Sequence, residues 1–216
     1  MFFKTLPASA QGIFARLGHD PFIRAFYLAG GSAAALQLGH RVSADLDLFT
    51  PNVYDPVALL SRLERLGQVT VQQQGEGTWV GLLAGTRISF FHYGYPLMHP
   101  PDTYRGLRIA SLLDIALMKI TAISQRGRRR DFVDLYFICK NQEFELGDLL
   151  KQIPEKYGSL SYPSYHLLRS LAYFDDAERD PPLKMLTRCN WNRIKVFFEK
   201  QVRELMGASI PGGPRA

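Results

Sequence analysis

Hydrophobic and polar positions follow two different periods along this chain. In the first hundred residues, short stretches that are apolar, or that alternate between apolar and polar side chains, are bounded by Gly and Pro, which predicts strands. These stretches are 26–30, 44–50, 69–74, 78–85 and 87–93. Short turns separate the last three stretches, so we expect these strands to be antiparallel.

Helical spacing of apolar residues begins among these strands and dominates after them. A small-residue helix is expected over 32–39, and a second over 55–67 opens with Asp and Pro and ends at Gly. Five further helices are predicted at 111–126, 131–141, 146–158, 164–177 and 190–205. The pattern indicates an α+β fold, with a mixed-sheet core over 1–100, a helical domain over 101–206 and a disordered tail over 207–216.

Composition and charge narrow the class of protein without identifying it. The 216 residues suffice for a sizeable core. No apolar run approaches the roughly 18 residues of a membrane span, and the start of the chain lacks an apolar signal core. Cys139 and Cys189 are too few for a disulfide framework and lack metal-site spacing, so we expect a cytoplasmic protein with no membrane contact. The formal charge of +6 favours an anionic partner such as a nucleotide or RNA, although a mildly basic soluble protein would carry the same charge.

Two carboxylates, Asp45 and Asp47, interrupt an apolar strand. Side chains alternate along a strand, so both point to one face, roughly 6.6 Å apart, while Leu46 and Leu48 point to the core. Two divalent ions about 3.5–4 Å apart fit between such side chains, and substrate phosphates complete the coordination. Cations would offset the repulsion between the carboxylates, which predicts a metal site. A strand with a solvated face is the alternative.

A glycine corner lies one short helix before this strand. Gly30 and Gly31 let the backbone approach a ligand closely, and Ser32 follows where the helix is expected to begin. Free N–H groups at a helix N-terminus bind phosphate, and the Ser32 hydroxyl could join them. Alone, this is an ordinary strand-to-helix turn with a serine cap. Because this turn comes one helix before the Asp-x-Asp strand, the sequence predicts a phosphate-binding turn beside a metal site.

The stretch GGSAAALQLGHRVSADLDLF, residues 30–49, resembles the first motif of the DNA polymerase beta-like nucleotidyltransferase superfamily. There a Gly-Ser turn precedes a strand with two metal-binding aspartates. Together with RIASLLDIALMKITAISQRGRRRDFVDLYFI, residues 108–138, it resembles the AbiEii/AbiGii-type nucleotidyltransferases, toxins of abortive-infection and type IV toxin–antitoxin systems. The resemblance implies a nucleotidyltransferase core, an NTP substrate and Mg²⁺ held by Asp45 and Asp47.

The second motif places two cations on one predicted helix. Lys119 and Arg126 lie seven residues apart, hence nearly aligned two turns apart. Lys119 can neutralise a triphosphate as a compact cation, and Arg126 can do so through its guanidinium fork. The resemblance favours this role. Without it, both would be solvated cations on the outer face of the helix.

A dense positive run follows, formed by Arg126 and the arginines at 128–130. It would attract an RNA backbone or a triphosphate, and a solvated loop is the alternative. Asp131 and Asp134 come next, at i and i+3. They could cap a helix, with Asp131 as the N-cap and Asp134 at N3. The resemblance implies instead that Asp131 belongs to the nucleotide site and positions Arg or Lys side chains.

One element of the superfamily pattern is missing. Many of these enzymes carry a third carboxylate on a later strand, where it helps to bind the catalytic metal and can act as general base. The corresponding strand over 87–93 has Ser89 and Phe91 at plausible positions and contains no Asp or Glu. This absence puts full two-metal catalysis in doubt, and leaves a water or a substrate group to fill the place.

The sequence therefore predicts a metal-dependent nucleotidyltransferase in which Asp45, Asp47 and Lys119 serve catalysis. An NMP passes from an NTP to an acceptor hydroxyl, which family analogy suggests is on tRNA, and a cognate antitoxin is the expected protein partner. A non-catalytic nucleotide-binding protein and a small-molecule nucleotidyltransferase are the alternatives. The predicted nucleotide contacts are Gly30, Gly31, Ser32, Lys119, Arg126 and Asp131.

Overall fold

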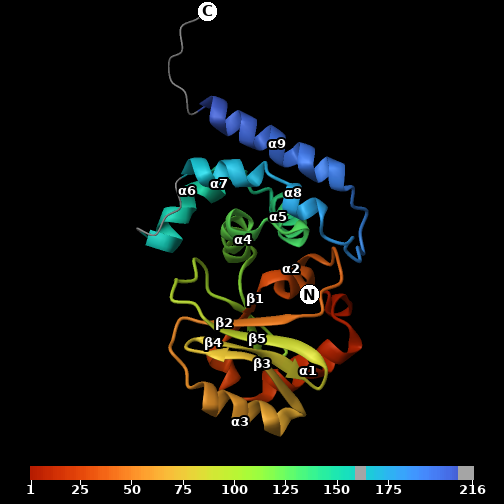
Figure 1. The fold of residues 1–216 in the computed structure, drawn as a ribbon, viewed down its shortest axis with the longest axis vertical. Helices are drawn as coiled ribbons and strands as arrows, with labels where there is room; N and C mark the ends of the chain where they lie inside the picture. The colour runs from red at the N-terminus through yellow and green to blue at the C-terminus, as the bar shows by residue number, and fades with distance from the viewer. Residues whose placement is uncertain (159–163, 209–216) are drawn as a thin grey trace, which may run out of the picture. The chain divides into compact units, whose positions relative to one another are not determined.

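The computed structural model of the chain describes residues 1–158 and 164–208 (Figure 1). The chain divides into two compact units. The first comprises Met1–Ile115 with Lys184–Thr187, and the second comprises Ala116–Leu183 with Arg188–Ala216. Helix α4 (Leu112–Arg126) starts in the first unit and continues in the second. Within the described ranges, no helix is both long and apolar enough to cross a membrane.

A seven-stranded mixed sheet forms the first unit. Its strands are β1 (Tyr27–Ala29), β2 (Leu46–Thr50), β3 (Val69–Gly75), β4 (Thr78–Leu83), β5 (Thr86–His92), β6 (Asp102–Tyr104) and β7 (Leu107–Ile109). They lie in the order β3-β4-β5-β2-β1-β7-β6. Strands β3, β4 and β5 are antiparallel neighbours, and so are β1 and β2. Strand β2 pairs in parallel with β5, and β1 pairs in parallel with β7.

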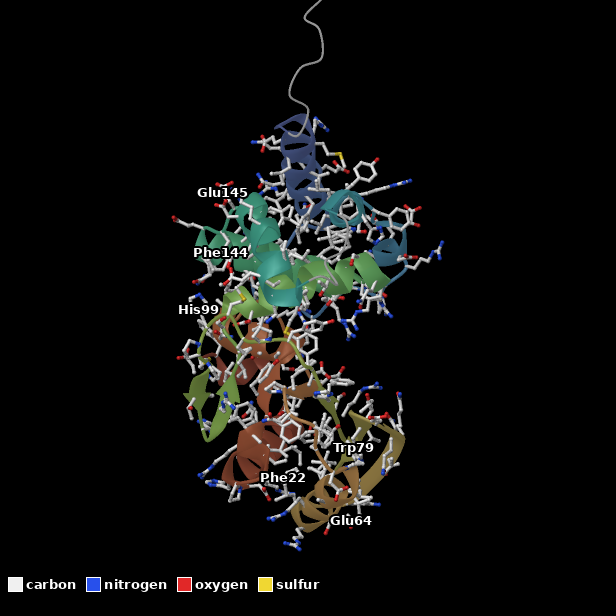
Figure 2. The ribbon with its side chains drawn as sticks, turned by 90° about the vertical axis from the view of Figure 1, so that its left-hand side faces the viewer. Phe22, Glu64, Trp79, His99, Phe144 and Glu145 are labelled. Atoms are coloured by element: carbon white, nitrogen blue, oxygen red, sulfur yellow. The ribbon has the colours of Figure 1, made fainter. Side chains whose placement is uncertain are left out.

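The side chains on one face of this sheet form part of the buried hydrophobic core. Leu46 and Leu48 of β2 are fully buried, as the alternation of their strand predicts. On the same face, the buried Trp79 ring (Figure 2) packs edge-on against Phe90, with 6.0 Å between ring centroids. The helices that accompany the sheet are α1 (Ala8–His19), α2 (Gly30–Leu38) and α3 (Pro56–Leu66).

Helix α3 shows how local sequence sets these boundaries. The Asp55 side chain accepts a hydrogen bond from the Val57 amide at 2.9 Å, and proline occupies the first turn, so the helix begins here. Leu59 and Leu63 are buried one turn apart, whereas Glu64 on the outer side is exposed (Figure 2).

The second unit is helical. After α4 come α5 (Arg129–Gln142), α6 (Leu146–Tyr157), α7 (Ser164–Leu171), the short α8 (Asp175–Glu178) and α9 (Trp191–Ala208). Helix α9 contacts α5, α6 and α7. Phe132 of α5 lies at the centre of an aromatic cluster, with its ring 5.4 Å from Phe198 and 5.1 Å from Phe174. Burial of these rings therefore joins α5 to α9 and to the segment before α8.

The predicted α+β fold, with a mixed sheet and a mainly helical C-terminal part, is confirmed. The short strands β6 and β7 and the helix α1 were not indicated by the sequence pattern. The helix expected over 164–177 is two helices, because residues 172–174 interrupt it. The predicted tail lies outside the described residues from 209 onward, and residues 207 and 208 end α9.

Candidate active site

The glycine corner joins β1 directly to α2. Ala29 is the N-cap of α2, and its side chain makes no hydrogen bond to the first N–H groups of the helix. Gly30 has φ of +65°, a conformation that other residues rarely adopt. A Cβ atom built there would lie 3.3 Å from Oδ2 of Asp47. Glycine therefore lets the start of α2 approach this carboxylate.

Arg41 is a site residue that the sequence pattern did not single out. A Cβ atom on Gly31 would collide with its guanidinium group and would lie 3.2 Å from the Ser43 hydroxyl. The Arg41 residue is only 4% exposed, and its Nη1 donates to the Val42 carbonyl oxygen at 3.1 Å. A buried guanidinium thus lies against the glycine corner. The only sequence signal was an arginine between two otherwise apolar stretches.

Ser32 lies inside α2, two residues after the helix begins, which corrects the predicted start at this residue. It is buried, and its hydroxyl donates to the backbone carbonyl of Asp45. The Ser43 hydroxyl lies 3.0 Å away. In this structure Ser32 therefore ties α2 to the residue preceding β2, and a direct contact with a phosphate stays a prediction.

The strand expected over 44–50 begins at Leu46, so Asp45 immediately precedes β2 and Asp47 is its second residue. Both aspartates are half-buried, and alternation places Asp47 on the face opposite to the buried leucines. Asp47 is paired with Ala29 of β1 on one side and with Ser89 of β5 on the other. The carboxylate therefore lies between the end of β1, where α2 starts, and the middle of β5.

The register also shows which residue of β5 lies beside Asp47. Ser89, directly beside Asp47, is flanked on the same face of β5 by Arg87 and Phe91. Within the described residues, no group of three or more His, Cys, Asp or Glu side chains could hold a metal ion. The carboxylates available are Asp47 on β2 and Asp45 just before it, and two carboxylates would fit Mg²⁺ because that ion commonly takes one or two and completes its shell with phosphates and water.

The second unit contains a buried cluster of opposite charges. The ammonium group of Lys119 on α4 lies 2.7 Å from Oδ1 of Asp131 and 2.6 Å from Oδ2 of Asp134, both on α5. The side chain of Lys119 is 6% exposed and both carboxylates are fully buried. Lys119 is therefore not the solvated cation of the alternative interpretation.

Arg126 completes this cluster from the end of α4. Its Nε lies 3.1 Å from Oδ2 of Asp131, and its side chain remains 52% exposed. Burial alone would raise the pKa of Asp131, but the charges and hydrogen bonds of Lys119 and Arg126 outweigh burial and hold that pKa below its ordinary value. Asp131 thus contacts both cations, as the resemblance implied.

The capping interpretation of Asp131 is wrong. Helix α5 begins at Arg129 with Arg128 as its N-cap, so Asp131 is the third helical residue and its amide donates to the Arg128 carbonyl oxygen. Its carboxylate is engaged with α4 and does not cap the first turn. The Asp131 carboxylate is buried because α4 packs against α5, and this packing brings it to Lys119.

Two arginines of the positive run are already paired. Nη2 of Arg128 lies 2.6 Å from Asp180, and Nη2 of Arg129 lies 3.1 Å from Glu178. Burial would raise the pKa of Asp180, but Arg128 and the Arg129 amide lower it below the ordinary range. These two arginines are therefore not simply solvated, and they hold the segment around α8 against the start of α5.

Comparison with known proteins identifies relatives that match most of the chain. The model of a family described as "Nucleotidyl transferase AbiEii toxin, Type IV TA system" matches residues 86–205. That range contains Lys119, Arg126 and Asp131, whereas Asp45 and Asp47 precede it. An uncharacterized protein of Aquifex aeolicus (strain VF5) is 35% identical over 185 residues, which are 84% of this chain and 88% of that protein.

Solved structures resemble the chain in fold. JHP933 from Helicobacter pylori is 16% identical, with a TM-score of 0.50 over 94% of this chain and 96% of that one. A crystal structure of a proposed nucleotidyltransferase from H. pylori is 15% identical, with a TM-score of 0.51 over 95% of this chain and 100% of that chain. At these identities the likeness extends to the fold alone.

Proposed function

The chain belongs to the AbiEii family of nucleotidyltransferase toxins and is a nucleotidyltransferase, and we propose that it catalyses a Mg²⁺-dependent transfer of an NMP from an NTP to an acceptor hydroxyl. The acceptor oxygen would bond to the α-phosphorus, the bond between the α- and β-phosphates would break, and pyrophosphate would leave. The observation that carries this proposal is the position of Asp47 on β2, with Asp45 immediately before the strand, beside the glycine corner where α2 begins. Carboxylates and the N–H groups of a helix N-terminus meet there, and both can bind a metal-bound nucleotide.

Asp45 and Asp47 would hold the metal, which when bound neutralises phosphate charge and aligns the reacting oxygens. The backbone N–H groups of Gly30 and Gly31 would bind phosphate oxygens, helped by the positive end of the α2 dipole. Arg41 would place a further positive charge at this corner, since its guanidinium lies against Gly31. The chain thereby supplies positioning and electrostatic stabilisation, which dominate in phosphoryl transfer.

Arg126 and Lys119 would divide their roles. Arg126 is anchored by Asp131 yet keeps half of its side chain exposed, so its fork could bind a triphosphate without losing that anchor. Lys119 is enclosed by two carboxylates and would act chiefly by fixing Asp131 and Asp134. A direct phosphate contact by Lys119 requires one of these ion pairs to open.

The acceptor and the biological partner belong to the same proposal. The family description names a type IV toxin–antitoxin system, which supports a cognate antitoxin as the opposing gene product. The formal charge of +6 favours an anionic acceptor, for which we propose a cellular RNA such as tRNA. A non-catalytic nucleotide-binding protein is the second candidate. It is favoured by one observation: the residue beside Asp47 on β5 is Ser89, and β5 carries no Asp or Glu that could serve as the third carboxylate.

Calorimetric titration with a non-hydrolysable NTP analogue tests the site. We expect Mg²⁺-dependent binding by the wild type and none by Asp45→Asn/Asp47→Asn. The matched control Asp102→Asn, exposed on β6 of the same sheet, should bind normally. Incubation of labelled NTP with total tRNA then distinguishes the enzyme from the binding protein. Unchanged analogue affinity in a folded double variant would remove the metal site from this proposal.

A further inference from the structure

Aromatic side chains form a continuous row beside the Asp-x-Asp pair. The Phe49 ring lies 5.3 Å from Phe91 and 5.6 Å from Tyr93, and Tyr93 lies 5.0 Å from Tyr95, measured between centroids. We call Phe49, Phe91, Tyr93 and Tyr95 the aromatic platform. The buried ring of Tyr27 stacks on Phe49 from β1 at 6.0 Å. The platform therefore crosses from the centre of the sheet toward the segment that follows β5.

The platform lies on the face of the sheet that carries the aspartates. Phe49 follows Asp47 by two residues on β2, so their side chains share a face about 7 Å apart. Phe91 is paired with Phe49, just as Ser89 is paired with Asp47. Tyr93 extends the same pairing, because its amide donates to the Thr50 carbonyl oxygen at 2.7 Å. Phe49 and Phe91 thus lie two residues along the strands from Asp47 and Ser89, and Tyr93 and Tyr95 follow farther along the chain, after β5 ends.

Partial exposure distinguishes the platform from a core cluster. On the opposite face, Phe90 and Trp79 are fully buried, as aromatic rings of a structural core usually are. All four platform residues are only half-buried. Ring surface therefore remains accessible next to the site of transfer, and rings with accessible faces are the groups on which unpaired bases stack.

Charge on the same face favours an anionic occupant. Arg87, which is exposed, precedes Ser89 by two residues on β5 and shares its face. Arg108 of β7 is paired with Tyr27, so it belongs to the same rung as Phe49 and Phe91. In β1, β2, β5 and β7, the aspartate of β2 is the only acid on that face. Aromatic rings flanked by arginines are typical of surfaces that bind single-stranded nucleic acid.

We propose that the aromatic platform stacks unpaired bases at the end of a single-stranded RNA acceptor and thereby holds its terminal hydroxyl near Asp45 and Asp47. This inference rests on the proposed function and names the acceptor class of that site. The base of the NTP could cover only part of four rings that lie in a row. The flanking arginines suit a chain with several phosphates, which the acceptor supplies.

Fluorescence titration with a short single-stranded RNA carrying 2-aminopurine at its 3′ end tests the platform without requiring transfer. Stacking should quench the probe on wild-type protein. Tyr93→Leu and Phe91→Leu keep an apolar side chain but remove the ring, and each should weaken binding about 5- to 150-fold. Tyr93→Phe retains the ring and should bind like the wild type. Tyr165→Leu, an exposed tyrosine of the second unit, is the matched control.

The outcomes separate this inference from the proposed function. Equal RNA affinity for the wild type and both folded leucine variants would overturn the platform, even if NMP transfer occurs. The platform would also be overturned if the protein quenched 2-aminopurine riboside triphosphate but did not quench the labelled RNA, because the occupant would then be the NTP. RNA quenching that depends on Tyr93 in a protein that transfers no NMP would refute the enzyme and leave the platform standing. Urea unfolding midpoints equal to that of the wild type would show that weaker RNA binding by a variant is not caused by loss of folding.

Discussion

Replacing Lys119 by methionine tests how far the buried carboxylates of α5 depend on its ammonium group. Methionine keeps most of the volume and flexibility of the lysine stem but carries no charge. The wild-type ammonium lies 2.7 Å from Asp131 and 2.6 Å from Asp134, and both carboxylates are fully buried. In the variant these two negative charges would face each other in a site with little access to water.

The size of the effect follows from this burial. Removing one partner of a buried ion pair costs about 3–5 kcal/mol. Arg126 would still neutralise Asp131, so we expect the lower end, about 3 kcal/mol of lost unfolding free energy. With urea m-values of about 1–3 kcal/mol/M, the midpoint would fall by about 1–3 M. Lys151→Met removes an exposed partner of Asp148 and should cost less than about 1 kcal/mol, which makes it the matched control.

The pH dependence gives a second readout with a defined sign. In the wild type, the pKa of Asp131 is lowered on folding, so its stabilising contribution is present above the unfolded value of about 3.9 and is lost as the pH falls. In the variant, burial without the ammonium should raise the carboxylate pKa values, so acidification relieves repulsion. The difference in unfolding free energy between the wild type and the variant should therefore be smaller at about pH 4 than at pH 7. A gap below about 1 kcal/mol at pH 7, or one of equal size at both pH values, would refute the reasoning.

Three further changes follow from the same structure. Gly31→Ala places a Cβ atom on the buried Arg41 guanidinium, so we expect about 1–3 kcal/mol of destabilisation by urea titration and loss of NMP transfer; full activity would contradict that contact. Ser32→Ala leaves the carbonyl that precedes β2 without its donor, which should cost about 1–3 kcal/mol, and unchanged stability and NTP affinity would argue against the link. Arg128→Ser should leave the salt dependence of tRNA binding unchanged because Asp180 already binds this arginine; a slope smaller by about 0.7–0.9 would show that it contacts a phosphate.

The elements with a strong local pattern were predictable from the sequence. The strand that carries Asp47 alternates cleanly, although it begins one residue after Asp45, and α3 has an Asp-Pro start and a glycine end. By contrast, β6 and β7 are three residues each, too short for a period to emerge. Strand β7 pairs in parallel with β1, which is distant in sequence, and no local pattern encodes such a pairing.

The candidate site was predictable where residue type and spacing suffice, and not where packing decides. The aspartates and the glycine corner form a short motif with a known chemistry. Arg41 acquires its place only through contact with Gly31, which spacing does not reveal. For Asp131, capping and ion pairing were both compatible with the sequence, and the choice depended on the helix starting two residues earlier and on Lys119 facing it.

The return of the chain to the first unit limits how the protein can be divided. After helix α8, Lys184 accepts a hydrogen bond from the Val42 amide at 2.8 Å, and Leu186 donates to the His40 carbonyl oxygen at 2.9 Å. These bonds brace the same loop that holds Arg41 against the glycine corner. A recombinant fragment ending near residue 115 would lose this brace, although it would contain every residue of the Asp-x-Asp motif. Fragments for crystallography or for split-protein complementation should therefore supply residues 184–187 in trans, or by circular permutation.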